Sequence, residues 1–164
     1  MRGRHGGRTG GAAAGGAYIF TWSGTSWTQQ QKIQASDKQA IDFFGASVAI
    51  SGDGNTAIVG AFQEDTGGTS AGAAYIFTRS GTSWSEQQKI QASDKQGGDY
   101  FGQDVAISAD GNTAIVGARR EDTGGTHDTA AYIVTWSGTP RTQQQNIQES
   151  DKQTSGEFGK TVAI

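Results

Sequence analysis

Residues 74–130 read AYIFTRSGTSWSEQQKIQASDKQGGDYFGQDVAISADGNTAIVGARREDTGGTHDTA, and the rest of the chain consists of copies of this stretch. Tyr18 returns as Tyr75 and again as Tyr132, a step of 57 residues with no insertion. Most positions of the quoted stretch are identical in the copy that precedes it. A fixed long period of this kind is the signature of a repeat architecture, and it decides the fold before any local pattern does.

The composition is that of an all-β protein with many short strands. Of the 164 residues, 34% are hydrophobic and 18% are charged, and there are 26 glycines but a single proline. Tyr, Phe, Ile and Val recur in short blocks separated by clusters of Gly, Ser, Thr, Asn and Asp. Such blocks and clusters are typical of strands joined by tight turns. A disordered chain would contain fewer aromatic residues and an excess of one charge.

Charge, cysteine content and hydropathy argue against several classes of function. The net charge is −3, and basic residues gather only at Arg2, Arg4 and Arg8, which we interpret as a solvated end. A nucleic-acid-binding protein is expected to carry a basic stripe, so no nucleic-acid partner is predicted. The absence of cysteine excludes disulfides, thiolate metal sites and cysteine nucleophiles. No apolar run approaches the roughly 20 residues of a membrane span, and the first residues lack the apolar segment of a secretory signal.

Each repeat unit divides into four stretches of strand length, at 74–78, 84–91, 101–108 and 113–118. Between the last two lies Asp110-Gly111-Asn112, which is a hairpin signal because Gly and Asn tolerate the positive φ that a short turn demands. Four strands joined by short turns predict a four-stranded antiparallel meander.

The pattern of apolar residues indicates how these meanders pack. Val105-Ala106-Ile107 and residues 114–118 are apolar at consecutive positions, whereas a strand with one solvated face would alternate apolar and polar residues. The inner strands are therefore predicted to be covered on both faces. The polar stretch 84–91 suits an outer edge strand, where charges discourage edge-to-edge pairing.

Blades stacked face to face around an axis satisfy these constraints, so the predicted fold is a β-propeller. It is all-β, with four-stranded antiparallel blades that repeat every 57 residues, about three repeats and an open or partial ring. A parallel β-solenoid is the alternative, but its coils repeat at about 20 to 30 residues.

Phenylalanine-glycine and glycine-alanine pairs mark the register of the copies. They are, in chain order, Phe44, Gly45, Gly60, Ala61, Phe101, Gly102, Gly117, Ala118, Phe158 and Gly159. With the Val-Ala-Ile strand between them, these pairs resemble the FG-GAP repeat, the unit of the propeller at the head of integrin α chains and of similar arrays in bacterial surface and secreted proteins. The proline of that family's motif is missing, because Phe62 and Arg119 follow the two Gly-Ala pairs.

The resemblance implies where each blade begins, since that family places the Phe-Gly strand innermost. Residues 1–164 then form a single repeat domain, with complete blades at 44–91 and 101–148. Residues 17–34 would form a partial blade, and 158–164 the first strand of a further one. Neither end resembles the polar cap that protects terminal repeats.

No constellation of residues predicts a catalytic or metal site. Calcium loops of some integrin-type repeats carry several Asp or Asn residues, but the turns at Asp53 and Asp110 carry one carboxylate each, so no cofactor is predicted. The remaining acidic groups recur with the repeat and are interpreted as turn caps; they are Asp37, Asp42, Asp94, Asp99, Glu121 and Asp122. The two histidines, His5 and His127, lie far apart in the sequence, so the chain is predicted not to be an enzyme.

Four tryptophans are the candidate ligand-binding residues: Trp22, Trp27, Trp84 and Trp136. They flank the Ser-Gly-Thr turn of each copy, and exposed tryptophans stack on sugar rings or anchor protein partners. The favoured interpretation is instead that they clamp this outer hairpin against the next blade. Neither position is the same in all copies, because Arg79 and Arg141 replace tryptophan.

These observations predict a non-catalytic interaction or structural module, located outside the cell or at its surface as the resemblance implies. Its expected partners are other copies of itself, or a cell-surface protein or glycan. Uncapped ends and uniform repeats favour either self-assembly into a ring or filament, or a fragment of a larger surface adhesin. The alternative is a multivalent carbohydrate-binding propeller with one weak site in each blade.

Overall fold

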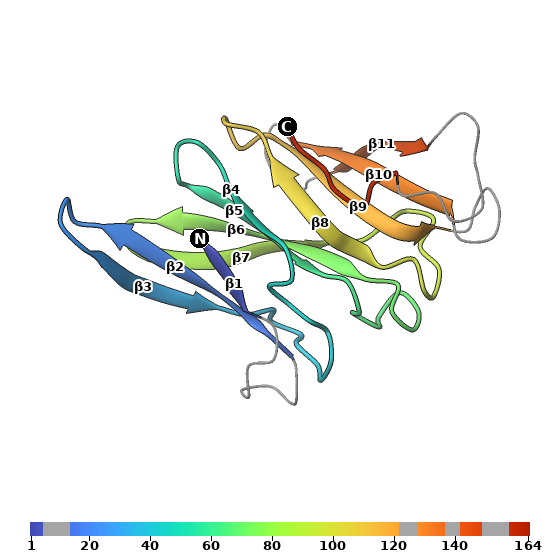
Figure 1. The fold of residues 1–164 in the computed structure, drawn as a ribbon, viewed down its shortest axis with the longest axis horizontal. Coiled ribbons are helices and arrows are strands. Elements are labelled where there is room, and N and C mark those ends of the chain that lie inside the picture. The colour runs from blue at the N-terminus through green and yellow to red at the C-terminus, as the bar shows by residue number, and fades with distance from the viewer. Residues whose placement is uncertain (5–13, 122–127, 137–141, 149–157) are drawn as a thin grey trace.

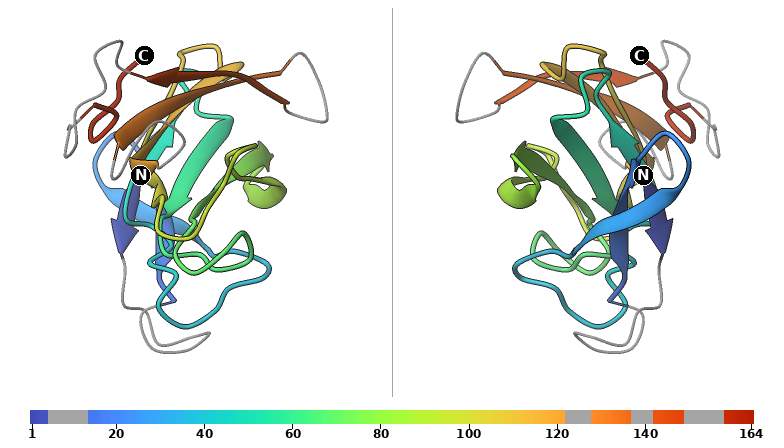
Figure 2. Two further views of the ribbon diagram at one scale, coloured as in Figure 1. Left: turned by 90° about the vertical axis from the view of Figure 1, so that its right-hand side faces the viewer. Right: turned by 90° about the vertical axis from the view of Figure 1, so that its left-hand side faces the viewer.

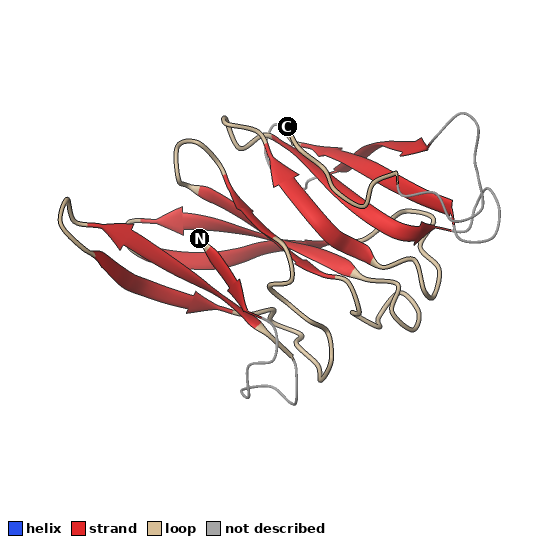
Figure 3. Cartoon of the chain, viewed as in Figure 1, coloured by secondary structure: helices blue, strands red, loops and turns tan. Residues whose placement is uncertain are grey.

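Three antiparallel β-sheets follow one another along the chain (Figure 1). The computed structural model describes residues 1–4, 14–121, 128–136, 142–148 and 158–164. These residues form strands, turns and loops, and no helix occurs among them (Figure 3). Figure 2 views the row of sheets from either end. No sheet in the described part of the chain closes into a barrel.

In each sheet the strands lie in the order of the sequence, and each pairs with its neighbours. The first sheet contains β1 (Arg2–Arg4), β2 (Gly16–Trp22) and β3 (Trp27–Ile33). The second sheet contains β4 (Val48–Ile50), β5 (Thr56–Ala61), β6 (Ala73–Ser80) and β7 (Ser83–Ile90). The third sheet contains β8 (Phe101–Ile107), β9 (Thr113–Glu121), β10 (Asp128–Thr135) and β11 (Thr142–Gln148).

The sheets confirm the predicted all-β class and the antiparallel pairing of neighbouring strands. The strands of the second sheet lie within residues 44–91, and those of the third lie within 101–148. This succession of similar sheets is consistent with the blades of a partial propeller. The number of blades in a complete ring stays a prediction.

The hydrophobic core lies between successive sheets. One cluster of buried side chains joins the first and second sheets and includes Ile19, Val59 and Tyr75. A second cluster joins the second and third sheets and includes Ile58 and Tyr132. Because Ile58 and Val59 are neighbours in β5, they point to opposite faces of the sheet, and both faces are buried there as the apolar pattern predicts.

Glycine at the repeat markers lets the backbones of successive sheets touch. A Cβ atom on Gly60 would overlap the carbonyl oxygen of Gly102, which belongs to the next sheet. Gly102 has a φ of 87°, and a Cβ atom there would overlap the carbonyl oxygen of Ala73. Gly117 meets Gly159 in the same way. Glycine is therefore required by backbone contact between sheets as well as by local conformation.

The marker phenylalanines fill the space beside these glycines. Phe44 and Phe101 are buried, and their rings meet Tyr75 and Tyr132 edge-on at centroid distances of 5.5 and 5.2 Å. The backbone N–H of Phe101 also donates to the carbonyl of Ala71 at 3.0 Å, which ties the start of β8 to the second sheet. The Phe-Gly pair thus serves as the joint between one sheet and the next.

The first sheet contains a strand that the prediction of a partial blade at 17–34 leaves out. In β1, Gly3 lies opposite Ala17, just as Gly60 in β5 lies opposite Ala74. Gly3 precedes Gly60 by one repeat, so β1 corresponds to β5 of the second sheet. The backbone of Arg2 and Arg4 pairs with β2, and the interpretation of these arginines as a solvated end stays a prediction; Arg8 lies outside the described residues.

The last described segment does not form the strand predicted at 158–164. Phe158 and Gly159 lie in a turn, and no strand is assigned to the residues that follow. The segment still contacts the third sheet, because the backbone N–H of Val162 donates to Oδ2 of Asp104 at 2.9 Å. A strand is assigned only where it pairs with a neighbour, and no described strand forms a hydrogen-bonded ladder with this segment.

Ile41 occupies a strained backbone position that glycine fills in the next copy. Its φ is 74°, a region that β-branched residues rarely adopt, and Gly98, one repeat later, has a φ of 92°. Ile41 is 55% exposed, so removing its side chain loses little packing. We expect Ile41→Gly to raise the free energy of unfolding by about 1 kcal/mol, measured by urea denaturation.

The reciprocal substitution Gly98→Ile is the matched control, and it is expected to lower the free energy of unfolding by a similar amount or more. An added Cβ atom at Gly98 meets no atom within 4 Å, so the loss should come from backbone strain and not from a clash. A fall in stability for Ile41→Gly would contradict the prediction.

Candidate functional site

An exposed pair of tryptophans lies on the outer face of the first sheet. Trp22 at the end of β2 and Trp27 at the start of β3 are cross-strand partners. Their ring centroids are 5.4 Å apart, and the two residues are 53% and 66% exposed. The described chain places no further sheet over this face (Figure 1). The pair therefore forms an aromatic surface of the kind that stacks on rings or packs against another protein.

The other two candidate tryptophans are buried between sheets. Trp84, the counterpart of Trp27, is 5% exposed, and its indole Nε1 donates to Gln30 Oε1 in β3 at 3.1 Å. Gln31 makes two hydrogen bonds with the backbone of Trp84, of 2.7 and 2.8 Å. Trp136 is 9% exposed and belongs to the core between the second and third sheets. These two clamp successive sheets, so of the four candidates only the pair in the first sheet exposes its rings.

The outer face of the first sheet repeats a pattern that is buried elsewhere. Lys32 Nζ lies 5.9 Å from the ring centre of Tyr18, and both residues are partly exposed. Their counterparts Lys89 and Tyr75 make the same contact at 5.8 Å, but there the first sheet covers Tyr75 completely. The Tyr75 hydroxyl donates to Asp37 Oδ1 of that sheet's loop at 2.8 Å. We call the uncovered surface of the first sheet the open face; its residues are Tyr18, Trp22, Trp27 and Lys32.

Charged side chains pair where the first and second sheets meet. Lys89 Nζ lies 2.8 Å from Asp37 Oδ2 and 2.8 Å from Glu64 Oε1. Glu64 is 2% exposed, and its second oxygen accepts a hydrogen bond from Gln91 Nε2 at 2.9 Å. The backbone N–H of Thr66 donates to Glu64 as well, at 2.9 Å. A buried carboxylate is thus satisfied by one cation and two further donors, as burial of a charge requires.

The pKa directions in this cluster agree with a fixed ion pair. Burial alone would raise the pKa of Asp37, but hydrogen bonds from Lys89 and Tyr75 outweigh it and hold that pKa below its ordinary value. Burial would lower the pKa of Lys89, and hydrogen bonds to Asp37 and Glu64 outweigh it and raise that pKa. Burial, followed by the hydrogen bond to Asp37, raises the pKa of Tyr75, so its hydroxyl stays protonated and donates.

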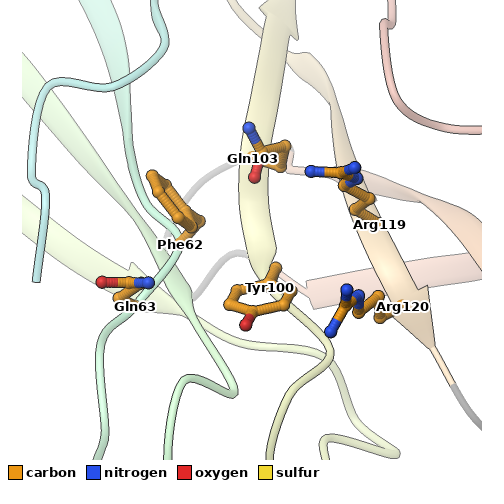
Figure 4. Close-up of a pocket in the computed structure, with 6 residues that line it drawn as sticks. All are labelled: Phe62, Gln63, Tyr100, Gln103, Arg119 and Arg120. Carbon is orange, nitrogen blue, oxygen red and sulfur yellow. The ribbon is translucent and has the colours of Figure 1, made fainter. Parts of the chain in front are cut away.

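A hollow of about 190 Å³ lies at the junction of the second and third sheets (Figure 4). It is bordered on one side by the residues that follow β5 and on the other by the start of β8 and the end of β9. Figure 4 shows two arginine side chains directed from β9 toward the residues of β8. We call this site the arginine hollow; its lining residues are Phe62, Gln63, Tyr100, Gln103, Arg119 and Arg120.

Sequence reasoning alone misses the arginine hollow, because its residues come from two sheets. The sequence contains one signal for this site. Arg119 and Arg120 stand where the preceding copy has Phe62 and Gln63, so two cations occur in one copy and none in the other. The approach of Tyr100 to Phe62 follows only from how the second and third sheets pack.

Three acidic residues of the turns bond within their own loops, as expected of residues that cap turns. Asp53 Oδ1 accepts from the Ser51 hydroxyl at 2.5 Å and from the Asn55 backbone N–H at 3.0 Å, and these bonds lower the pKa of Asp53. Asp110 makes equivalent bonds. Asp42 accepts from the backbone N–H of Gln39 at 2.5 Å. Among the residues that the structure describes, no group of three or more His, Cys, Asp or Glu could hold a metal ion, and the absence of a cofactor stays a prediction.

Other candidate groups are placed only in part. Asp94 Oδ1 accepts from the Tyr132 hydroxyl at 3.0 Å, and Asp99 Oδ2 accepts from the backbone N–H of Gln96 at 2.5 Å. The bond of Asp99 lies within its own loop, but that of Asp94 joins the loop to the next sheet, as the bond from Tyr75 to Asp37 does. Asp37 and Asp94 therefore connect sheets, a role that their interpretation as turn caps did not include. The side chain of Glu121 lies outside the described part of the structure, as do the residues His5, Asp122 and His127. Over the described ranges, no helix is long and apolar enough to cross a membrane.

Comparison with known proteins identifies the repeat. The family model described as the FG-GAP repeat matches the chain twice, over residues 27–77 and 84–134. The matches begin at Trp27 and Trp84, one repeat apart, and together they cover more than half of the 164 residues. Each match runs from the outermost strand of one sheet through the third strand of the next, so it includes one Phe-Gly joint. A search of curated proteins gave no match.

Proposed function

Because this chain belongs to the FG-GAP repeat family, we propose that it is a non-catalytic interaction and structural module that acts outside the cell or at its surface. Repeats of this family suggest an interaction module of the extracellular type. In this proposal the three sheets are blades of an open propeller, one for each 57-residue unit. The module works through the open face, and its partner there is another copy of the same chain.

The observation that carries the proposal is the contrast between Trp27 and Trp84. The two residues occupy the same position in near-identical units, yet Trp84 is buried against a preceding sheet and Trp27 is exposed. The chain therefore contains, within itself, one example of how such a face is covered. A surface with an exposed aromatic pair of this kind is the usual centre of a protein interface.

The last sheet carries the residues that would cover the open face. Trp84 is held by Gln30 and Gln31 in β3, and the same positions in β11 are Gln144 and Gln145. A copy docked head to tail would therefore repeat the contact already present between the first and second sheets. Head-to-tail contacts of this kind close into a ring if the rotation allows it, and otherwise extend as a filament.

Sedimentation velocity over a range of protein concentrations tests this proposal. We expect the wild-type chain to associate and Trp27→Arg to shift it toward the 17.1 kDa monomer, because arginine is the residue that the third copy carries at this position. The control is Ile50→Thr, which removes an exposed apolar side chain from a different sheet and should leave association unchanged. A wild-type chain that stays monomeric at every concentration would refute self-association.

Carbohydrate binding is the second candidate function, and the exposed Trp22–Trp27 pair is the observation that favours it. Two tilted rings on an open surface can stack on a sugar. Several copies of the chain would then bind a glycan more tightly than one weak site does, through multivalency. Glycan-array binding that Trp27→Ala removes would support this function over self-association. The same face would also serve a larger surface adhesin, in which a neighbouring blade takes the place of the second copy.

A further inference from the structure

We propose that the arginine hollow is a binding site for an acidic saccharide, a sugar ring that carries a carboxylate. The site does not depend on the open face, which lies on a different sheet, so the two proposals stand or fall separately. Three features of the hollow carry the inference: a pair of cations, a row of aromatic rings, and a strained backbone that holds one of those rings.

Arg119 and Arg120 supply two guanidinium groups at the end of β9. Both residues are exposed, and Figure 4 shows their side chains directed into the hollow. Within the described ranges, neither forms an ion pair with an acidic side chain. Guanidinium groups donate paired N–H bonds to carboxylates, so the two side chains form a binding site for one carboxylate.

Three aromatic rings continue from the arginines across the junction of the sheets. Arg120 Cζ lies 5.6 Å from the ring centre of Tyr100, which lies 5.9 Å from that of Phe62. The ring of Phe62 in turn stacks on Phe43 at 5.4 Å. All three aromatic residues are partly exposed. Because the C–H face of a sugar ring is apolar, partly exposed aromatic faces beside polar groups are suited to stack on it.

An unfavourable backbone conformation holds Tyr100 in this row. Its φ is 56°, in the left-handed region that bulky residues seldom adopt. The backbone N–H of Tyr100 donates to Ser70 at 3.1 Å, and its carbonyl accepts from the N–H of Gln103 at 3.1 Å. Phe43, at the same position of the preceding copy, has a φ of 55°. Strained backbone conformations cluster at binding sites, where the benefit of orienting a side chain outweighs the free energy that the strain costs.

The size and polarity of the hollow fit one sugar ring with an acid group. Its volume of 190 Å³ is below the roughly 300 Å³ at which pockets for drug-sized ligands begin. Gln63 and Gln103 border it with amide groups, which both donate to and accept from hydroxyls. Inorganic phosphate would engage the arginines but leave the aromatic row without a contact. An acidic peptide of Asp and Glu lacks a sugar ring whose C–H face could stack on the aromatic row.

Titration calorimetry of the complete chain with trigalacturonate, a short uronic-acid oligosaccharide, tests the proposal. The control ligand is its methyl ester, which keeps the rings and removes the charge. We expect the acid to bind and the ester to bind at least about tenfold more weakly. Arg119→Gln and Arg120→Gln should each lower the affinity about tenfold. Arg79→Gln removes an arginine at the opposite end of the second sheet and should leave the affinity unchanged.

A second variant separates loss of binding from loss of folding. Tyr100→Asn removes the ring, and asparagine accepts the left-handed conformation, so the fold should be retained. We expect this variant to melt cooperatively and to bind trigalacturonate about tenfold or more weakly than the wild type.

Each remaining outcome is decisive. Absence of trigalacturonate binding overturns the proposal, and so does binding that survives both arginine substitutions. Equal binding of acid and ester would show sugar stacking without recognition of the carboxylate and would also overturn it. Equal binding of a triglutamate peptide would assign the hollow to an anionic peptide instead. The arginine variants should sediment as the wild type does, which keeps this result separate from self-association.

Discussion

Replacement of Gly60 by alanine is expected to lower the free energy of unfolding by about 3 kcal/mol. The new Cβ atom would overlap the carbonyl oxygen of Gly102, a backbone atom that cannot rotate out of the way as a side chain could. Gly60 is itself held by hydrogen bonds to Ser47 and Gly45, of 2.9 and 3.0 Å. The first effect of the substitution is therefore to push the second and third sheets apart. Urea denaturation measures the loss.

Gly81→Ala is the matched control for that experiment. Gly81 has a φ of 61° but no atom within 4 Å of an added Cβ, so alanine there should cost about 1 kcal/mol of backbone strain only. Gly117→Ala, which meets Gly159 as Gly60 meets Gly102, should resemble Gly60→Ala. Equal losses for Gly60→Ala and Gly81→Ala would show that contact between sheets is not the reason for the glycine.

Replacement of Lys89 by methionine is expected to lower the free energy of unfolding by about 3 kcal/mol at neutral pH. The substitution keeps most of the apolar stem but removes the cation that lies 2.8 Å from both Asp37 and Glu64. Glu64 is 2% exposed, so its carboxylate would be left buried beside hydrogen-bond donors but without its counter-charge. Chemical denaturation of the two chains at pH 7 gives the difference directly.

The double variant Lys89→Met with Glu64→Gln is the control, because it removes both charges of the buried pair. It should recover most of the stability lost in the single variant. If the double variant were as unstable as Lys89→Met, the loss would come from packing and not from the unpaired carboxylate. A double-mutant cycle that includes Glu64→Gln alone measures the coupling between the two residues.

The pH dependence of this difference follows from the direction of the pKa shifts. The pKa of Asp37 is lowered on folding, so its contribution is present above its ordinary value, near 3.9, and is lost as the pH falls through the folded pKa. The pKa of Lys89 is raised on folding, so its contribution is present below its ordinary value, near 10.4, and is lost at higher pH. The gap between wild type and Lys89→Met is therefore widest between these limits and narrows in acid.

Repeat spacing is sufficient to predict most of the strands. It also contains the signal for β1, which the predicted partial blade at 17–34 leaves out. The four stretches predicted at 74–118 became β6 to β9, and their copies one repeat away became β4, β5, β10 and β11, because each copy presents the same alternation of apolar blocks and turns. Gly3 lies one repeat before Gly60, and this spacing was the signal for β1. By contrast, residues 158–164 carry a full strand signal and form none, because pairing needs a neighbour that local sequence does not provide.

The candidate sites were predictable to a smaller extent. The four tryptophans were identified as a set, but which of them face solvent depends on the sheets that cover them. The arginine hollow combines Phe62 of one sheet with Tyr100 and Arg120 of the next. Residues so placed become neighbours only after two sheets have packed, so no spacing along the chain reveals them.

Local sequence was sufficient for the all-β class, the length of the unit and the positions where glycine is needed, because turn chemistry and apolar alternation act over a few residues. Packing alone settled what each copy of the unit exposes. Trp27 and Trp84 show this most clearly, since near-identical surroundings in the sequence leave one ring in solvent and the other under a neighbouring sheet. Whether a side chain is buried depends on the neighbouring sheet, and the described residues place no sheet over the open face.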